Sequence, residues 1–466
     1  MANETTAQRA SLMGSEKIGK LLWQFAGPAI LMMMVSSLYN VVDKIFVGRF
    51  LGDVGLAGTT MAGPVMRIFT AFAVLVGAGG NTLLALRLGE GKHEEAEKIL
   101  NNSFLVCGCV AILLSVIAEI FARPVLTILG CDAPTMVYAE PYLRIVACTA
   151  FFETMTSGMG LFIRTDGRPR YVMLCSITGC AINIVLDPVL IGAAHLGVAG
   201  AALATAFSQF ISGTLVLLYF TVLKSSTIKL RVRLLLLDVK MTLTSMKLGF
   251  SSFLQQFLGG LSQSIMYTCL SLYAGAAGAV SYSVAVASVG VTVGIGCLFV
   301  LPVMGMQTAI QPIIGYNYGA QKYDRVLKTL WTGVAIATGL CAVGWVVILV
   351  FPRPLALLFG AEEYLDYAVW TMRVYNLLLP MMALSALGSN FFQSIGKPLH
   401  AVFLGMSRQV LFMIPAVIIL SAIIGQRGVI WALPVADILS FSTAGFMLLR
   451  EAKRIKAAAP EQFQKA

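Results

Sequence analysis

Four polar side chains lie inside long apolar stretches of this 466-residue chain. Asp43 lies in YNVVDKIFVG and Asp187 in INIVLDPVLIG, and Asn183 precedes Asp187 by four residues, which puts both on one face of a helix. Thr205 lies about eight residues into the next stretch, roughly 12 Å from its start. Because a charged side chain at the centre of a bilayer costs at least about 2.5 kcal/mol, residues of this kind indicate a functional site.

Together these residues offer carboxylate, amide and hydroxyl oxygens. Pro188 has no N–H, so the carbonyl of Ile184 loses its helical partner and adds another oxygen beside Asp187. An oxygen-rich site of this composition would hold a sodium ion or serve a proton relay. The plainer alternative for Asp43 is a position at the membrane interface, next to Lys44, and the sequence leaves both interpretations open.

Five further side chains are candidates for substrate binding, because aromatic rings, methionines and buried acids suit large apolar cations. They are Tyr39, Met33, Tyr142, Glu153 and Asp437. Ordinary packing is the alternative for each of them, and for Asp437 this means a hydrogen bond between two helices. Arg67 also lies within an apolar stretch, and pairing with one of the carboxylates would oppose proton coupling.

The stretches that carry these residues are long enough to cross a membrane as helices. The chain is 58% hydrophobic and only 12% charged, whereas soluble domains carry about 25% charged residues. A helix crosses the bilayer core in about 20 apolar residues. The sequence predicts twelve spans, at 19–47, 54–86, 97–121, 136–163, 170–192, 197–223, 240–272, 277–316, 326–351, 364–394, 399–424 and 428–450.

Basic residues are distributed unevenly between the two sides of these spans. Of 33 Lys and Arg, 24 fall in the connections that lie on the same side as the two termini, and five fall in the opposite set. Since Lys and Arg are enriched in cytoplasmic loops, we expect both termini in the cytoplasm and a multi-pass location in a bacterial inner membrane. The net charge of +11 therefore does not indicate a nucleic-acid partner. We expect a monomer that contacts membrane lipid and amphipathic small molecules.

The chain contains an internal repeat. FARPVLTILG at 121–130 matches FPRPLALLFG at 351–360 at an offset of 230, and Gly167 matches Gly396 at 229. Each half holds six spans, so both enter the membrane from the same side, as in parallel-repeat transporters. We expect an N-terminal tail at 1–18, an N-lobe at 19–223, a cytoplasmic linker at 224–239, a C-lobe at 240–450 and a C-terminal tail at 451–466.

Four passages carry a resemblance to a known family. They are MGSEKIGKLLWQFAGPAI, LYNVVDKIFVGRFLG, IRTDGRPRY and AINIVLDPVLIG. With the twelve spans and the repeat, they resemble the multidrug and toxic compound extrusion (MATE) family, in particular its MepA-like and DinF-like bacterial members, over nearly the whole chain. The resemblance implies an all-α membrane protein with two homologous six-helix lobes in a V-shaped arrangement. It also implies export of amphipathic, often cationic compounds by alternating access, with no cofactor and with H⁺ or Na⁺ as the coupling ion.

The resemblance further implies roles for matching residues. Related members have a proton or sodium site in the N-lobe at the positions of Asp43, Asn183, Asp187 and Thr205. Glu153 resembles an acid that MepA-like members carry in the fourth span. The similar NorM branch has acids in the seventh and tenth spans, whereas Gly259 and residues 381–383 stand at comparable places here. We therefore expect cation coupling in the N-lobe.

Other functions remain as alternatives. The main one is a flippase for lipid-linked sugars from the same broad superfamily, although such proteins often have more than twelve spans and cationic grooves. An enzyme is not expected, because the chain has three scattered His and neither an HExxH nor a P-loop motif. The remaining alternatives are a channel and a non-transporting helical scaffold, but a two-lobed repeat favours alternating access.

Overall fold

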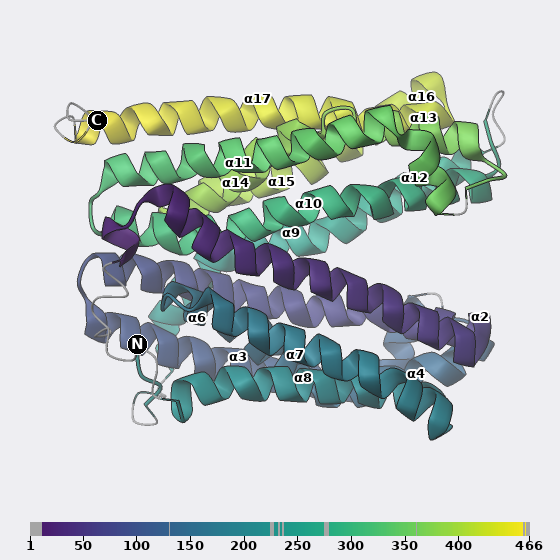
Figure 1. The fold of residues 1–466 in the computed structure, drawn as a ribbon, viewed down its shortest axis with the longest axis horizontal. Helices are drawn as coiled ribbons and strands as arrows, with labels where there is room; N and C mark the ends of the chain where they lie inside the picture. Colours follow the sequence, from purple (N-terminus) through teal and green to yellow (C-terminus); the bar gives the residue numbers. More distant parts are fainter. Residues whose placement is uncertain are drawn as a thin grey trace. The chain divides into compact units, whose positions relative to one another are not determined.

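The computed structural model describes residues 12–129, 131–223, 228–231, 234, 237–274, 279–359, 361–459 and 462, apart from the side chain of Asp53. These residues are almost entirely helical (Figure 1). A membrane interior offers no water to the backbone, and a helix satisfies its own N–H and C=O groups. The predicted all-α class is therefore confirmed.

The first half contains a very long helix and a set of shorter ones. In order they are α2 (Ile18–Gly89), α3 (His93–Ile128), α4 (Ala133–Cys148), α5 (Ala150–Thr154), the π-helical segment η1 (Met155–Met159), α6 (Gly160–Thr165), α7 (Pro169–Asp187), the π-helical segment η2 (Pro188–Ala193) and α8 (Gly197–Thr221). Gly52 interrupts α2 with a φ of 67°, which a residue without a Cβ adopts readily, so α2 supplies two of the predicted spans. The helical segments 133–148 and 150–165 together are long and apolar enough for one span, with a bend of 60° between them.

The second half repeats this order with different breaks. Its elements are α9 (Val239–Leu272), α10 (Tyr282–Gly319), α11 (Tyr323–Val350), α12 (Pro352–Leu358), α13 (Leu365–Tyr375), α14 (Leu379–Ser394), α15 (Pro398–Met406), the π-helical segment η4 (Ser407–Met413), α16 (Ile414–Ile424) and α17 (Gln426–Ala458). Gly167 and Gly396, which match in the repeat, precede α7 and α15 with φ of 82° and 77°. The repeat therefore extends to the conformation of the turns.

Over their described residues, all twelve predicted spans coincide with helical segments. Within the described residues, nine helices are long and apolar enough to cross a membrane alone, and the bent pair at 133–165 makes ten. The remaining two predicted spans coincide with α9, which is rich in Ser, Thr and Gln, and with α13 and α14, which are separated at 376–378.

The chain forms two compact units. Unit 1 comprises Gly27–Phe253 with the residues before Lys17, and unit 2 comprises Lys17–Ala26 with Leu254–Ala466. The division lies inside α9, because this helix continues from one unit into the other, whereas the sequence places the linker between the lobes at 224–239. The lobe boundaries remain a prediction.

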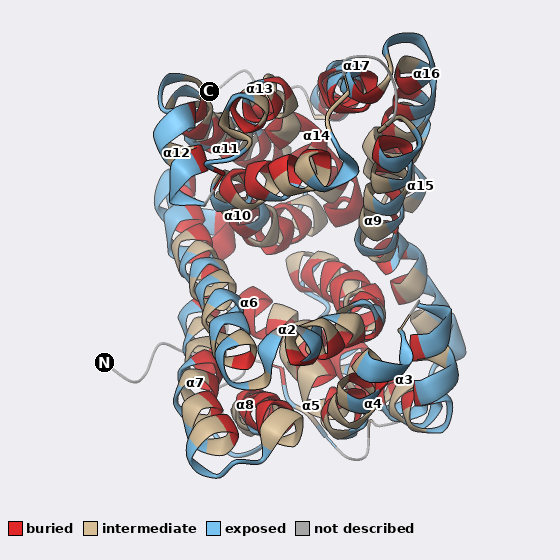
Figure 2. Cartoon of the chain, turned by 90° about the vertical axis from the view of Figure 1, so that its right-hand side faces the viewer, coloured by how far each residue is buried: buried red, intermediate tan, exposed pale blue. Residues whose placement is uncertain are grey.

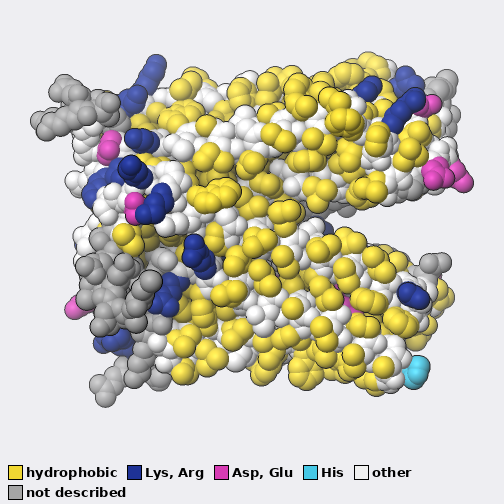
Figure 3. All heavy atoms as spheres, in the orientation of Figure 1, with side chains coloured by type: hydrophobic (Ala, Val, Ile, Leu, Met, Phe, Trp, Pro, Cys, Tyr) yellow, Lys and Arg dark blue, Asp and Glu magenta, His cyan; other side chains and the backbone are white. Residues whose placement is uncertain are grey.

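Each unit has its own apolar core. In unit 1, residues of α2, α3, α4 and α5 such as Phe69, Leu126 and Leu143 pack together, and a comparable cluster in unit 2 joins α9, α10, α16 and α17. Figure 2 shows the buried residues on the helix sides that face neighbouring helices. Many large hydrophobic side chains remain exposed. In Figure 3 they cover the middle of the visible face, with Lys and Arg toward its ends, as expected of surfaces that contact lipid.

Candidate functional site

The predicted cation site lies on α7 and α8, which pack along each other in unit 1 (Figure 1). α7 ends at Asp187, and η2 begins at Pro188, which has no N–H to continue the α-helical pattern. α8 approaches η2 closely because Gly200 lacks a side chain: a Cβ there would lie 2.7 Å from the carbonyl oxygen of Leu190. These elements hold Asn183 and Asp187 one turn apart on the same face of α7.

Asn183 and Asp187 are fully buried, each with an exposed fraction of 0%. Both carboxyl oxygens of Asp187, and the amide oxygen and nitrogen of Asn183, have no hydrogen-bond partner among the described residues. A buried polar group left without a partner costs about 1–3 kcal/mol, and a charged one costs more. Packing alone does not explain this cost, so the arrangement indicates a position that a bound ion or ligand completes.

Asp43 joins this pair from α2, and Thr205 of α8 is linked to it through Tyr142. The carboxyl groups of Asp43 and Asp187 lie close enough to influence each other electrostatically, and Oδ1 of Asp43 is also buried without a partner in the described part of the chain. Tyr142 of α4 interacts with both carboxyl groups. Its hydroxyl oxygen lies 3.4 Å from Oγ1 of Thr205, a buried residue. Four elements thus converge on the predicted site.

A third acid lies next to this cluster. Tyr39, one turn before Asp43 on α2, interacts with Asp43, Tyr142 and Glu153. Glu153 belongs to α5 and accepts a 2.7 Å hydrogen bond from Ser157, which lies in η1. Tyr39 and Glu153 are both half-buried. Three of the predicted substrate residues, Tyr39, Tyr142 and Glu153, therefore border the cation cluster.

Acidic groups outnumber basic groups around the cluster. Lys44 interacts with Asp43 but is itself exposed. Arg67 is exposed, and within the described residues it forms no ion pair with Asp43 or Asp187. The structure therefore does not show the pairing of Arg67 with either of these carboxylates that the sequence suggested. When both carboxyl groups are ionised, neither can donate a hydrogen bond to the other. A shared proton or a bound cation is then needed to offset the repulsion between the two negative charges. The arrangement can therefore bind a cation.

Asp437 lies elsewhere, on α17 in unit 2. It accepts a 2.7 Å hydrogen bond from Nε of Arg408 in η4, so the two residues form an ion pair between helices, in which Asp437 is buried and Arg408 is half-buried. Tyr375 interacts with both groups. This matches the interpretation of Asp437 as a helix-packing residue, and its role in substrate binding stays a prediction. Met33 is half-buried on α2, six residues before Tyr39, and its role also stays a prediction.

Two partners were missed by reasoning from the sequence. Ser157 follows Glu153 by four residues, and this helical spacing is a signal that could have identified it. Arg408 and Asp437 lie on different elements, η4 and α17, and no spacing along the chain relates them.

Comparisons with known proteins agree with this architecture. The MatE family model matches residues 28–189 and 253–419, once in each half. The multidrug export protein MepA of Staphylococcus haemolyticus is 25% identical over 432 residues, which cover 92% of this chain and 93% of that protein. MepA of Staphylococcus aureus strain MSSA476 is 24% identical over 424 residues, which cover 90% and 91% of the two chains.

Solved structures share the fold over nearly the whole length of the chain. One is a multidrug resistance MATE family transporter of the MOP superfamily in an outward-facing conformation. It has a TM-score of 0.89 and 21% identity, and the match covers 96% of this chain and 98% of that one. Another is a MOP superfamily transporter from Pyrococcus furiosus described as having a binding pocket of reverse polarity. It has a TM-score of 0.88 and 20% identity, over 98% and 100% of the two chains.

The fold, the repeat and the buried polar cluster define a multi-pass helical membrane protein of the transporter class. The chain belongs to the MATE family, as its sequence indicates. The predicted fold of twelve helices in two homologous lobes is confirmed by the solved relatives.

Proposed function

We propose that this chain is a cation-coupled antiporter that exports amphipathic, mainly cationic drugs or metabolites by alternating access. The observation that carries the proposal is the pair of buried carboxyl oxygens of Asp187, which have no partner among the described residues. The relatives named multidrug export proteins support the substrate class. Asp43, Asn183, Asp187 and Thr205 form the coupling site in this proposal.

Either a proton or a sodium ion would neutralise negative charge of the two carboxylates at this site. A sodium ion would take oxygen ligands from the two carboxylates, the Asn183 amide and the Thr205 hydroxyl. A proton would instead be shared between Asp43 and Asp187, which already interact. Tyr142, whose hydroxyl group lies next to Thr205, would keep the hydroxyl oxygens oriented in both cases.

The substrate would bind beside the coupling site. Tyr39 and Tyr142 offer aromatic faces for an apolar cation, and Glu153 offers a charge of the opposite sign. Met33 would extend this surface along α2, since methionine adapts to ligands of different shape. Asp437 is the remaining candidate, in unit 2, where the ion pair with Arg408 would have to open to free its carboxylate.

Coupling follows from unequal affinities in the two access states. When Asp43 and Asp187 are ionised, the site attracts a cationic substrate. A proton or sodium ion that enters from the outside neutralises the same carboxylates and lowers the affinity for the substrate, which then leaves to the outside. The exchange requires only that the substrate and the coupling ion compete for the same carboxylates.

The proposed cycle takes place in a bacterial inner membrane, with both termini in the cytoplasm. The excess of Lys and Arg in the connections on the side of the termini supports a cytoplasmic location for both ends, in a bacterial inner membrane. Each lobe would cross the membrane six times, and the chain would act as a monomer.

The test is dye transport in proteoliposomes with ethidium as the cationic substrate. We would impose a pH gradient and then a sodium gradient on wild type, Asp187→Asn and Asp132→Asn. Asp132 is an exposed helix-capping residue at the start of α4, and asparagine also caps helices, so this variant controls for the loss of a carboxylate. The expected result is gradient-driven dye movement in wild type and Asp132→Asn, and its loss in Asp187→Asn.

Two results would contradict the proposal. Coupled transport that persists in both Asp43→Asn and Asp187→Asn would remove the coupling role of this site. No gradient-driven dye movement in wild type would reject cationic dyes as substrates and favour the alternative, a flippase for lipid-linked sugars.

A further inference from the structure

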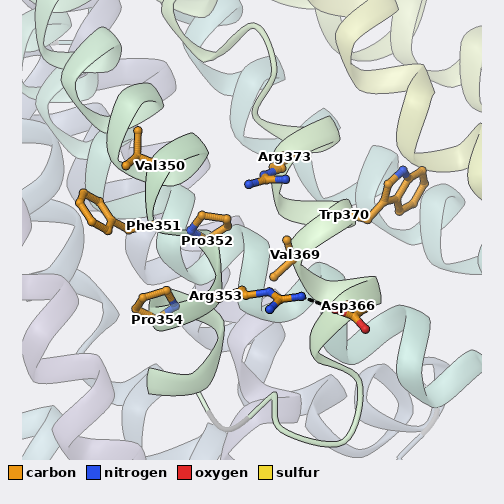
Figure 4. Close-up of a pocket in the computed structure, with 9 residues that line it drawn as sticks. All are labelled: Val350, Phe351, Pro352, Arg353, Pro354, Asp366, Val369, Trp370 and Arg373. Carbon is orange, nitrogen blue, oxygen red and sulfur yellow. Dashed lines mark hydrogen bonds and ion pairs between the residues drawn. The ribbon is translucent and has the colours of Figure 1, made fainter.

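A pocket lies in unit 2, where α11 ends and α12 and α13 pack against each other (Figure 4). Its volume is about 520 Å³, and its lining includes Phe351, Arg353, Asp366, Trp370 and Arg373. It lies far along the chain from Asp43 and Asp187, in the other compact unit, so the proposed coupling site does not use it.

The charges around this pocket do not balance. Arg353 pairs with Asp366 at 3.2 Å, and both side chains are largely exposed. Arg373 forms no ion pair in the described part of the chain; its Nη2 donates a long hydrogen bond of 3.4 Å to the carbonyl oxygen of Leu349. Two arginines and one aspartate leave a net charge of +1 on the lining. In addition, Arg427 lies over the ring of Trp370 at 5.5 Å from its centroid.

The internal repeat shows that this imbalance is specific to unit 2. Arg144 in unit 1 matches Arg373 at an offset of 229. Its Nη1 also donates to the carbonyl of the matching residue, Glu119, at 3.0 Å. There, however, the arginine is neutralised by the carboxylates of Glu119 and Glu140, at 3.2 and 2.9 Å.

The residues at the corresponding positions of unit 2 are apolar. Glu119 is replaced by Leu349 at an offset of 230, and Glu140 by Val369 at 229. Val369 lines the pocket. The two units therefore share the arginine and its backbone contact, but only unit 2 leaves the guanidinium without an acid.

The surroundings of the pocket are apolar on the sides that face outward. Val350 and Phe351, which line it, are among the exposed large hydrophobic side chains. A tryptophan beside basic residues at the end of a spanning helix is typical of the membrane–water interface. An occupant should therefore combine an anionic group with an apolar body.

We propose that this pocket binds the phosphate group of an anionic phospholipid, with Arg373 as the main contact and Arg353 as the second. A guanidinium group matches phosphate oxygens in a bidentate arrangement. The exposed Val350 and Phe351 would contact the glycerol and upper acyl region of the lipid. In the proposed orientation the lipid belongs to the outer leaflet, but binding does not depend on the transport activity proposed above.

The test is native mass spectrometry of the full chain released from detergent, with phosphatidylglycerol and phosphatidylcholine added in equal amounts. We expect wild type to retain phosphatidylglycerol preferentially. Arg373→Gln should reduce this preference about fivefold, because one basic group near a membrane surface contributes about that much to the binding of anionic lipid. Arg123→Gln is the matched control: Arg123 matches Arg353 in the repeat, is exposed and lies outside the pocket.

Two further variants change the charge at the pocket in opposite directions. Asp366→Asn should increase the retention of phosphatidylglycerol, because it frees Arg353 from its ion pair. Leu349→Glu should decrease it, because it restores the acid that neutralises the matching arginine in unit 1. Thermal unfolding in detergent would identify any variant that does not fold.

Three outcomes would overturn the proposal. The first is equal retention of the two lipids by wild type. The second is a preference that survives in both Arg373→Gln and Leu349→Glu. The third is that millimolar inorganic phosphate displaces phosphatidylglycerol and no lipid remains bound. That result would show that the pocket binds a free anion and not a lipid headgroup.

Discussion

At the scale of single residues, the two units differ in the partners that surround a buried aspartate. In unit 1, Asp187 faces Asp43, and its carboxyl oxygens have no partner among the described residues. In unit 2, Asp437 has the guanidinium of Arg408 at 2.7 Å. A carboxylate that is already neutralised has little affinity for a further cation, so we place coupling at Asp187.

Thr205 provides a test of the ligand set. We predict that Thr205→Val weakens the apparent affinity for the coupling ion about tenfold, because it removes a hydroxyl oxygen that would contact a charged group. Thr205→Ser should retain the wild-type affinity, because it keeps the hydroxyl. The measurement is ethidium transport as a function of the concentration of the driving ion. Wild-type behaviour of Thr205→Val would remove Thr205 from the site.

The pair formed by Arg408 and Asp437 should behave as a structural ion pair. Arg408→Leu or Asp437→Leu alone should destabilise the protein by roughly 3 kcal/mol, because each leaves a buried or half-buried charge without its partner. The double variant should be more stable than either single one. Thermal unfolding in detergent measures this, and additive losses in the double variant would show that the two side chains are not coupled.

The identities of the candidate residues could be predicted from the sequence, but several of their partners could not. Asp43 and Asp187 stand out because a carboxylate inside an apolar stretch is costly. The pairing of Arg408 with Asp437, and the electrostatic interaction of Tyr39 with Glu153, depend on how separate helices pack. One sequence contains no local signal for such contacts.

At the scale of elements, hydropathy was sufficient to locate the helices, because the length of a span is set by the thickness of the bilayer. It was not sufficient to locate their irregularities. The π-helical segments η1 and η4 interrupt helices, and η2 continues α7 to its end; of the three, η2 has a clear local cause, in Pro188. π-helical turns occur frequently at functional sites, and η2 directly follows Asp187.

The packing of α8 against η2 should be sensitive to a single methyl group. We predict that Gly200→Ala displaces η2, because the new Cβ would lie 2.7 Å from the carbonyl oxygen of Leu190, and that the protein loses about 1–3 kcal/mol of stability. Transport should fall as well, since Asp187 lies at the adjoining end of α7.

Gly63→Ala on α2 is the matched control for this substitution, because a Cβ at Gly63 would meet nothing within 4 Å. Thermal unfolding in detergent and ethidium transport compare the two variants. Equal stability and equal transport would show that the close approach at Gly200 does not matter.

At the scale of the whole molecule, the repeat and the charge distribution are the features that the sequence revealed most clearly. Both halves match the MatE family model, and the turns at Gly167 and Gly396 have the same left-handed conformation. The division into compact units was less accessible, because it lies within the continuous helix α9. Apolar composition indicates that a helix spans the membrane, but not to which unit its two ends belong.

The proposed orientation can be tested with reporters. We predict that green fluorescent protein fused after Ala466 is fluorescent, and that alkaline phosphatase at the same point is inactive, because the C-terminal connections are rich in Lys and Arg. Fusions in the opposite set of connections, for example after Arg353, should show the reverse. Alkaline phosphatase activity at the C-terminus would contradict the orientation.

The measurement that tests the coupling site most directly is equilibrium binding of ethidium to the purified protein in detergent. Fluorescence anisotropy would be recorded at a series of sodium concentrations and at a series of pH values, for wild type and Asp187→Asn. We predict that one of the two ions raises the apparent Kd of wild type for ethidium, and that Asp187→Asn no longer responds to that ion. An apparent Kd of wild type that is independent of both ions, or a full response in Asp187→Asn, would contradict cation coupling at this site.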